Sequence, residues 1–368
     1  MAGLYVHIPF RATPCLYDDS PIVLARPPHR SYLRAVQQEM AHYAQRYAEP
    51  IRTVYFGGGR PSLLDLEALD TLLGAIRDHF AAADAEEVTL ELNPADAAPQ
   101  YLRGVRNLGV DRLSLDVMSF YAEDLSALQA PHSAVQAEAA IAAVHDAGFD
   151  RFSVDLLFGW AAQDPLHWKA NLQKAVRLGA PHIAIQECTG DQLAEAPDAM
   201  RTDQYRFAVD FLTDHEYEHY EISHFARPGQ RGLHNQRHWD HTNYLGLGPS
   251  AHSFWWDDLP AHRWSNVRNL ARYEALLRQR HRPTAQQTPL DLPALADEYV
   301  LLRLRTRDGL DLDTLRTRYG VDLQTRSAHL LERLVRDDYL EPLNDRRVRL
   351  TERGMLLCDT VTQQLLHH

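Results

Sequence analysis

The stretch Gly3-Leu-Tyr-Val-His-Ile-Pro-Phe-Arg-Ala-Thr-Pro-Cys-Leu-Tyr-Asp-Asp19 opens with an apolar run and passes directly into a loop that carries a cysteine. Residues 4–8 predict a β-strand, and Pro9 is expected to end it because proline cannot donate to a strand ladder. A second strand is expected at 51–56, running into three glycines and then a leucine-rich helix at 63–80. The chain therefore begins as repeated strand–loop–helix units.

The same alternation continues through the first two thirds of the chain. Further strands are expected at 87–92, 112–117, 151–158, 182–187 and near 218–222, with helices at 30–48, 135–145 and 166–178. Strands that alternate with helices across short turns indicate a parallel sheet. We therefore predict an α/β fold, a partial (β/α) barrel over residues 1–227.

The remaining sequence has a different character. Residues 228–290 are richer in Trp, His and Gly and form a connecting segment with less strand–helix alternation. Residues 291–368 predict helices at 295–304, 312–319 and 323–336, a hairpin near 340–350 that turns at Asn344-Asp345, and a last helix from Thr351. Helices followed by a small β-ribbon predict a mostly helical, winged-helix-like domain.

Composition narrows the class of protein. The 368 residues carry a formal net charge of −12, which argues against a nucleic-acid partner. No apolar run is long enough for a membrane span and no signal peptide is expected, so we predict a cytoplasmic protein. Cys15, Cys188 and Cys358 are too few and too scattered for a disulfide framework. The 20 histidines favour metal or haem binding in general. Because histidine is so common in this chain, any single histidine is weaker evidence for such a site.

The ends of the predicted strands carry the first candidate site. Gly57, Gly58 and Gly59 lie between a strand and a helix, where bare backbone lets a ligand approach and a helix N-terminus favours anions. A tight strand-to-helix turn explains the same glycines equally well. Glu91 ends the next strand, where its carboxylate is suited to a ribose or an amine, or else to a cap or turn.

These residues resemble a known family. The first stretch is similar to the first strand and cluster loop of radical S-adenosylmethionine (SAM) proteins, in particular oxygen-independent coproporphyrinogen III oxidase and its HemW-type haem-chaperone branch. In that family three cysteines spaced C-x3-C-x2-C follow His-Ile-Pro-Phe, whereas this chain has Arg11, Cys15 and Asp18. The family's glycine turn continues with Thr, which is Arg60 here.

The resemblance also marks where the family binds SAM. It implies residual SAM-site positions at Tyr5, Gly57, Gly58, Gly59, Arg60, Glu91 and Asp155. Several matching positions are substituted: the family's Gln is Met118, its Gly is Asp116, and an Arg is Ala130. Iron–sulfur clusters are held by thiolates, so a guanidinium and a carboxylate are poor replacements. The iron–sulfur cluster and SAM are the family's cofactors, and we expect this chain to have lost both. The alternative is that Cys188 supplies a second thiolate to a cluster.

The best-preserved stretch lies further on. His234-Asn-Gln-Arg-His-Trp239, followed by Tyr244-Leu-Gly-Leu-Gly-Pro-Ser-Ala-His-Ser-Phe254, resembles the haem-chaperone branch, with His238 in place of a Tyr. The resemblance implies that His234 binds the haem iron, with Trp239 giving apolar support and His238 nearby. Neutral imidazole is a good haem ligand. Two other readings stay open: a zinc site made with His241, or a structural His234.

The resulting hypothesis is a haem-binding or haem-trafficking protein, not an enzyme, whose partners are haem or a related tetrapyrrole and haem-accepting proteins. One alternative is a radical SAM enzyme with an atypical cluster that acts on a tetrapyrrole. The other is a non-catalytic scaffold. Arg11 and Arg60 either fill the former SAM site or bind another anion, such as a haem propionate.

Overall fold

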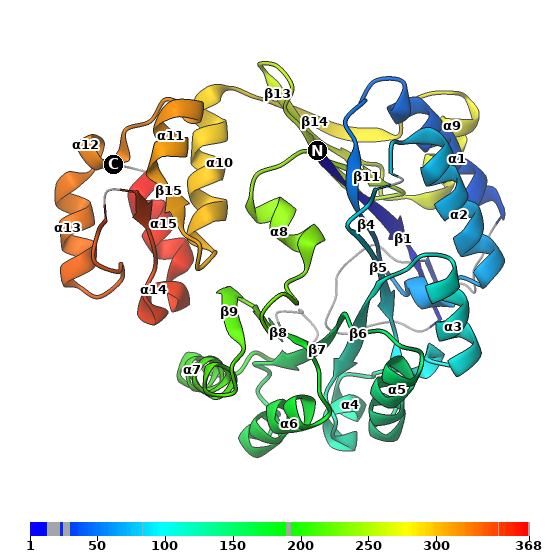
Figure 1. Cartoon of the computed structure of the whole chain (residues 1–368), viewed down its shortest axis with the longest axis horizontal. Helices are drawn as coiled ribbons and strands as arrows, with labels where there is room; N and C mark the ends of the chain where they lie inside the picture. The colour runs from blue at the N-terminus through cyan, green and yellow to red at the C-terminus, as the bar shows by residue number, and fades with distance from the viewer. Residues whose placement is uncertain (13–22, 25–29, 83, 189–192, 345, 367–368) are drawn as a thin grey trace.

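The computed structural model describes residues 1–12, 23–24, 30–82, 84–188, 193–344 and 346–366. Most of its strands belong to one 12-stranded sheet, and two short pairs stand apart from it. Figure 1 shows the sheet on one side of the molecule, the C-terminal helices on the other, and the short helix α8 (Leu233–Trp239) between them. None of the described helices is long and apolar enough to cross a membrane.

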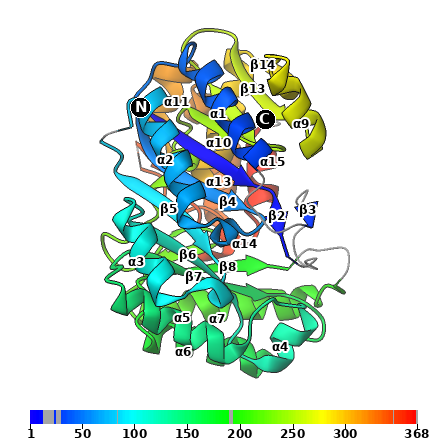
Figure 2. The same ribbon diagram turned by 90° about the vertical axis from the view of Figure 1, so that its right-hand side faces the viewer.

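One half of the sheet is parallel, as predicted. Its strands are β1 (Ala2–Ile8), β4 (Ile51–Gly58), β5 (Glu87–Leu92), β6 (Arg112–Met118), β7 (Phe152–Phe158) and β8 (His182–Glu187). The helices that follow these strands are α1 (Arg30–Ala44), α2 (Leu66–His79), α3 (Pro99–Asn107), α4 (Ala122–Ala127), α5 (Ala134–Asp146), α6 (Pro165–Arg177) and α7 (Asp198–Asp214). Figure 2 shows several of them lying over the outer face of the strands.

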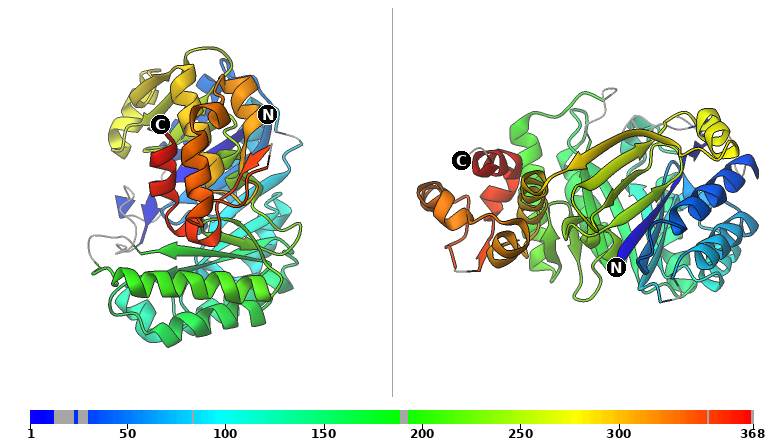
Figure 3. Two further views of the ribbon diagram at one scale, coloured as in Figure 1. Left: turned by 90° about the vertical axis from the view of Figure 1, so that its left-hand side faces the viewer. Right: turned by 90° about the horizontal axis from the view of Figure 1, so that it is seen from above.

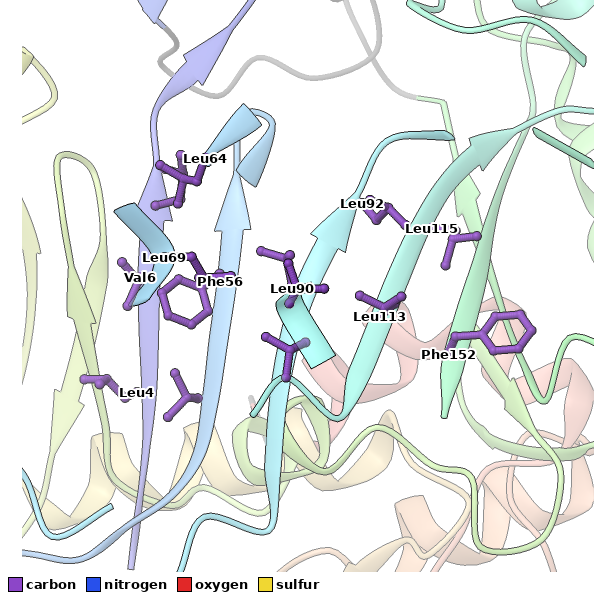
Figure 4. Close-up of a cluster of buried hydrophobic side chains, with 14 of the residues drawn as sticks. Leu4, Val6, Phe56, Leu64, Leu69, Leu90, Leu92, Leu113, Leu115 and Phe152 are labelled. Atoms are coloured by element: carbon purple, nitrogen blue, oxygen red, sulfur yellow. The ribbon is translucent and has the colours of Figure 1, made fainter. Parts of the chain in front are cut away.

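Alternation along each strand separates an apolar face from a polar one. Leu4, Phe56, Leu90 and Leu113 are fully or almost fully buried and pack towards the covering helices (Figure 4). The residues between them, such as Glu91, point to the inside of the partial barrel. Because those inner positions are polar, the interior is built for binding groups rather than for an apolar core.

The other half of the sheet comes from the predicted connecting segment and the strands before it. Its elements are β9 (Glu218–Glu221), β10 (His224–Ala226), β11 (Tyr244–Leu247), β12 (His252–Trp255), β13 (Ala261–Asn266), α9 (Leu270–Arg278) and β14 (Thr284–Leu290). β11 pairs in parallel with β1, and β12 to β14 follow antiparallel. Residues 244–290 thus extend the sheet, while the divisions at 227 and 290 remain predictions.

The C-terminal part has its own apolar core, and Figure 3 shows its helices gathered beside the sheet. Its elements are α10 (Leu292–Leu304), β15 (Leu310–Asp311), α11 (Leu312–Tyr319), α12 (Leu323–Arg326), α13 (Ala328–Arg336), β16 (Arg347–Val348), α14 (Glu352–Leu356) and α15 (Cys358–Leu366). With this helical part and its small ribbon, the predicted fold class is confirmed.

Three local predictions were wrong. The helix expected at 63–80 is a 3-10 turn, Pro61–Leu63, followed by α2, because Asp65 caps the amide of Ala68 and restarts the helix. The helix expected at 323–336 is divided into α12 and α13 at Ser327. The hairpin expected at 340–350 keeps one bridge between Leu340 and Leu350, because β16 pairs with β15 instead.

Candidate functional site

A cavity of about 330 Å³ opens where the parallel strands end. The lining residues are Tyr5, Arg11, Gly58, Gly59, Arg60, Pro61, Glu91, Leu92, Asn93, Ser114, Asp116, Asp155 and Gln186. The structure therefore brings together most of the residual SAM-site positions, since the ends of neighbouring parallel strands meet at one edge of a sheet.

Glu91 ties the glycine turn to the floor of this cavity. Its carboxylate accepts hydrogen bonds from the Gly58 amide and the Tyr55 hydroxyl, both at 3.0 Å. Gly58 has φ +110° and lies against His7, so a Cβ there would come within 2.6 Å of the imidazole. Burial raises the pKa of Glu91 to about 8, although the hydrogen bond from Tyr55 opposes the shift. Near neutral pH this carboxyl group is therefore largely protonated.

Asp155 forms the second acidic position. Ser114 donates to its Oδ2 at 2.8 Å, while Oδ1 is buried without a hydrogen-bond partner. Burial raises the pKa of Asp155, and the hydrogen bond from Ser114 opposes that shift. The two strand-end carboxyl groups thus both hold their protons more strongly than exposed ones do.

Arg60 lines the cavity and is paired with Asp96. Its guanidinium makes two hydrogen bonds to Asp96, at 2.6 and 2.7 Å, and Ser62 donates to the same carboxylate at 2.6 Å. Both partners are mostly buried, with Arg60 12% and Asp96 18% exposed. Because Asp96 neutralises this cation, the structure does not support the prediction that Arg60 binds a haem propionate.

Arg11 lies at the first of the three family cysteine positions and lines the cavity. Its Nε donates to the Gly59 carbonyl at 3.0 Å, and Nη2 lies 3.5 Å from the Gly58 carbonyl. Cys15 and Asp18, the other two positions, lie outside the described residues. A protonated guanidinium cannot ligate iron, so the donor set does not fit a three-thiolate cluster.

An apolar cluster lies at the ends of β6 and β7. Met118, Leu157, Trp160 and Cys188 are at most 4% exposed and pack together, with Ala130 against them. Met118 is held at φ +62°, a left-handed conformation that costs an ordinary side chain energy. Cys188 packs in this group and is not among the cavity-lining residues, which speaks against its use as a second thiolate.

Helix α8 carries the predicted haem-binding residues and lies inside the barrel, next to the starts of β4 and β5. Its first two amides, those of Leu233 and His234, donate to the carboxylate of Glu87 at 2.9 Å each. The imidazole of His234 is only 3% exposed. It packs against Gly3, where a Cβ would lie 3.3 Å from the ring.

Both ring nitrogens of His234 are engaged. Nδ1 lies 3.0 Å from the Thr53 hydroxyl, and Nε2 lies 3.4 Å from Nε2 of His238. Burial lowers the pKa of His234 well below its usual value and lowers the pKa of His238 to about 4, with Arg263 acting in the same direction on His238. Both imidazoles are therefore neutral at pH 7, the state that a metal ligand requires.

Trp239 and His241, the other candidate residues of this segment, have different surroundings from His234. Trp239, at the end of α8, is half-buried, and its indole nitrogen has no hydrogen-bond partner. His241 points elsewhere: its ring nitrogens lie 2.9 Å from the Tyr319 hydroxyl and 3.2 Å from the Glu298 carboxylate. The structure does not support the three-histidine zinc reading, since the described part of the chain holds no group of three ligands placed for a metal.

Tyr55 connects the two regions. Its hydroxyl donates to Glu91 in the cavity, and its ring stacks on His234 with centroids 5.1 Å apart. Neither Tyr55 nor Glu87 stood out in the sequence as a functional residue. A signal was present, because Glu87, Thr89 and Glu91 place polar side chains at every second position of a buried strand.

Comparisons with known proteins agree with this geometry. The radical SAM superfamily profile matches residues 15–168, and the HemN C-terminal domain profile matches residues 290–357. This chain is also similar to the solved structure of coproporphyrinogen III oxidase (HemN) from Escherichia coli, which is a radical SAM enzyme. The two structures superpose with a TM-score of 0.85, and their sequences are 23% identical. The match covers 99% of this chain and 89% of that one. This likeness shows the fold.

Proteins found by sequence comparison have a higher sequence identity to this chain. Heme chaperone HemW of Mycobacterium tuberculosis (strain ATCC 25618 / H37Rv) is 32% identical over 381 residues, which span 99% of this chain and 94% of the relative. Heme chaperone HemW of Escherichia coli (strain K12) is 30% identical over 68% of this chain and 69% of its own length. Because the Mycobacterium tuberculosis relative is 32% identical over almost the full length of both chains, this chain belongs to the HemW family of radical SAM-type proteins.

Proposed function

We propose that this protein binds haem and delivers it to haem-accepting proteins in the cytoplasm, without radical SAM catalysis. The observation that carries the proposal is a contrast within one barrel. In the cavity at the strand ends, Arg11 and Arg60 are bonded to the chain's own groups, whereas α8 keeps two neutral imidazoles side by side. The names of the family relatives, Heme chaperone HemW, point in the same direction.

The imidazole pair limits how haem can bind. The Nε2 atoms of His234 and His238 face each other at 3.4 Å on one side of one helix. Two axial ligands approach a haem iron from opposite faces, with the macrocycle between them, so this pair can supply at most one axial ligand. His234 is the proposed ligand. Because His234 is buried and its Nε2 faces His238 on the same helix, α8 has to shift and the His238 side chain has to turn before iron can reach it.

The residues of the cavity do not fit the family's cluster and SAM. Arg11 stands where a thiolate is needed and is bonded to the glycine turn, and Arg60 is paired with Asp96. Met118 and Trp160 belong to an apolar group beside the cavity. We therefore propose that the chain has lost both cofactors, and we assign no chemical step to them.

The proposal is tested by titrating the purified protein with haem and following the Soret band. Wild type is expected to show a saturable shift, and His234→Ala is expected to weaken or change it. His329→Ala, an exposed histidine on α13, is the matched control and is expected to behave like wild type. A saturable shift that survives His234→Ala but not His238→Ala would move the ligand to the neighbouring residue. A complete lack of saturable binding by wild type would refute the proposed function.

One observation favours a second candidate, a radical SAM enzyme with an atypical cluster. The cavity remains open to about 330 Å³, and Glu91 still holds the Gly58 amide as a ligand-binding turn requires. This candidate predicts iron and acid-labile sulfide after anaerobic reconstitution. A reconstituted sample with neither would remove it.

A further inference from the structure

Helix α8 depends on contacts with the rest of the molecule for its position. It has seven residues, and its N-cap residue, Gly232, offers no side chain to its first amides. His234 is its one fully buried residue. A helix this short is not stable by itself in water, so tertiary contacts decide where it lies.

The contact that holds its first turn is Glu87. This residue comes from β5, is 1% exposed, and lies 147 residues from His234 in the sequence. One carboxylate oxygen accepts the Leu233 amide and the other accepts the His234 amide. A negative charge at a helix N-terminus satisfies amides that have no partner within the helix and interacts favourably with the helix dipole.

Two arginines lie beside this carboxylate and orient it. Arg151 donates to the same Oε2 atom at 2.7 Å, and the Nε of Arg112 lies 4.0 Å away. Arg151 also reaches Asp111 at 2.7 Å, so its guanidinium is itself fixed. The carboxylate therefore has little freedom to follow α8 if the helix moves.

We infer that Glu87 is a positioning residue for haem binding, which holds α8 in the barrel and so controls when His234 becomes available. This inference rests on the proposed function. The reason is that Glu87 holds the backbone amide of the same residue whose imidazole is the proposed ligand. When the amide leaves Glu87, the imidazole leaves Thr53 with it, while His238 moves along because it belongs to the same helix.

The test combines two measurements on Glu87→Gln in the full-length protein. Hydrogen–deuterium exchange of peptides covering 233–239 is expected to be about tenfold faster, because glutamine has one acceptor oxygen and one of the two amides loses its hydrogen bond. Stopped-flow absorption is expected to show haem binding several-fold faster, with the Soret position of wild type. Faster binding with an unchanged Soret position is not expected of a purely structural role of Glu87, and adding His234→Ala should abolish that Soret position.

The matched control is Glu86→Gln. Glu86 is the preceding residue and also contacts α8, through an ion pair with Arg237 at 3.1 Å, but it lies at the surface. It is expected to change both rates less than twofold. If Glu87→Gln fails to fold, Glu87→Asp keeps the charge beside the arginines but shortens the reach to α8, so it should produce the same acceleration.

The outcomes separate the inference from the proposed function. Exchange at 233–239, or haem binding, that stays at the wild-type rate in the Glu87 variant would overturn the inference while the protein still takes up haem. No haem uptake by wild type or by any variant would instead overturn the proposed function.

Discussion

The cavity at the strand ends and the region around α8 share the inside of one barrel, yet they satisfy their polar groups differently. In the cavity, Arg60 is neutralised by Asp96 and Arg11 is bonded to the glycine turn. Around α8, the Glu87 carboxylate and the Thr53 hydroxyl hold a helix of seven residues. Cations that are paired with the chain's own groups are not available to a ligand, whereas a helix held by a few polar contacts can move.

The largest expected effect tests the pairing in the cavity. Asp96→Ala leaves the mostly buried Arg60 and Ser62 without their partner, so the free energy of unfolding should fall by about 3 kcal/mol. Urea unfolding measures this loss. The control is Asp70→Ala, which removes an exposed pair with Arg77 and should cost less than about 0.5 kcal/mol. Equal losses would show that the Arg60 pair is not a buried structural contact.

The second prediction concerns Glu91. Its folded-state pKa of about 8 lies above its ordinary value of 4.5, so the folded protein keeps a proton that the unfolded chain releases. Stability should therefore be full near pH 4.5 and decline as the pH rises to 8, by on the order of 2 kcal/mol because the cavity partly solvates the carboxyl group. Urea unfolding at several pH values compares wild type with Glu91→Gln. Parallel pH profiles of the two proteins would contradict the assignment.

The α8 region should show the opposite slope. The folded-state pKa of His238 is about 4, below its ordinary value of 6.5, so the unfolded chain binds a proton first. This contribution is present above pH 6.5 and is lost as the pH falls towards 4, by on the order of 2 kcal/mol. His238→Gln should reduce the loss on acidification, and the exposed His329→Gln should leave it unchanged. If both variants follow wild type, His238 is not held neutral in the barrel.

The smallest effect is expected at the apolar group beside the cavity. Trp160→Phe removes an indole nitrogen that has no hydrogen-bond partner, which offsets part of the lost packing, so stability should change by less than about 1 kcal/mol. Trp168→Phe is the comparison, since that equally buried indole donates to the Gln204 carbonyl at 2.8 Å and should cost about 2 kcal/mol more. Thermal unfolding distinguishes the two. Equal costs would mean that Trp160 has a polar partner in solution.

The sequence predicted the elements with strong periodicity, and it pointed to about half of the residues that line the cavity. Strand β5 was predicted with its observed bounds, and Glu91 and the glycine turn were placed at strand ends. The partners of these residues could not be predicted, because Asp96 lies 36 residues from Arg60 and Glu87 lies 147 residues from His234. The two-residue strand β15 is too short for any pattern, which is why the local hairpin was predicted instead.

The most direct test is to titrate one anaerobically reconstituted sample with haem and, in parallel, with SAM. Optical spectroscopy follows haem, and calorimetry follows SAM. The account predicts saturable haem binding that depends on His234 and no heat of binding for SAM, because Arg11 and Arg60 are committed to the chain's own groups. Saturable SAM binding together with iron and sulfide in the sample, and no haem binding, would contradict it.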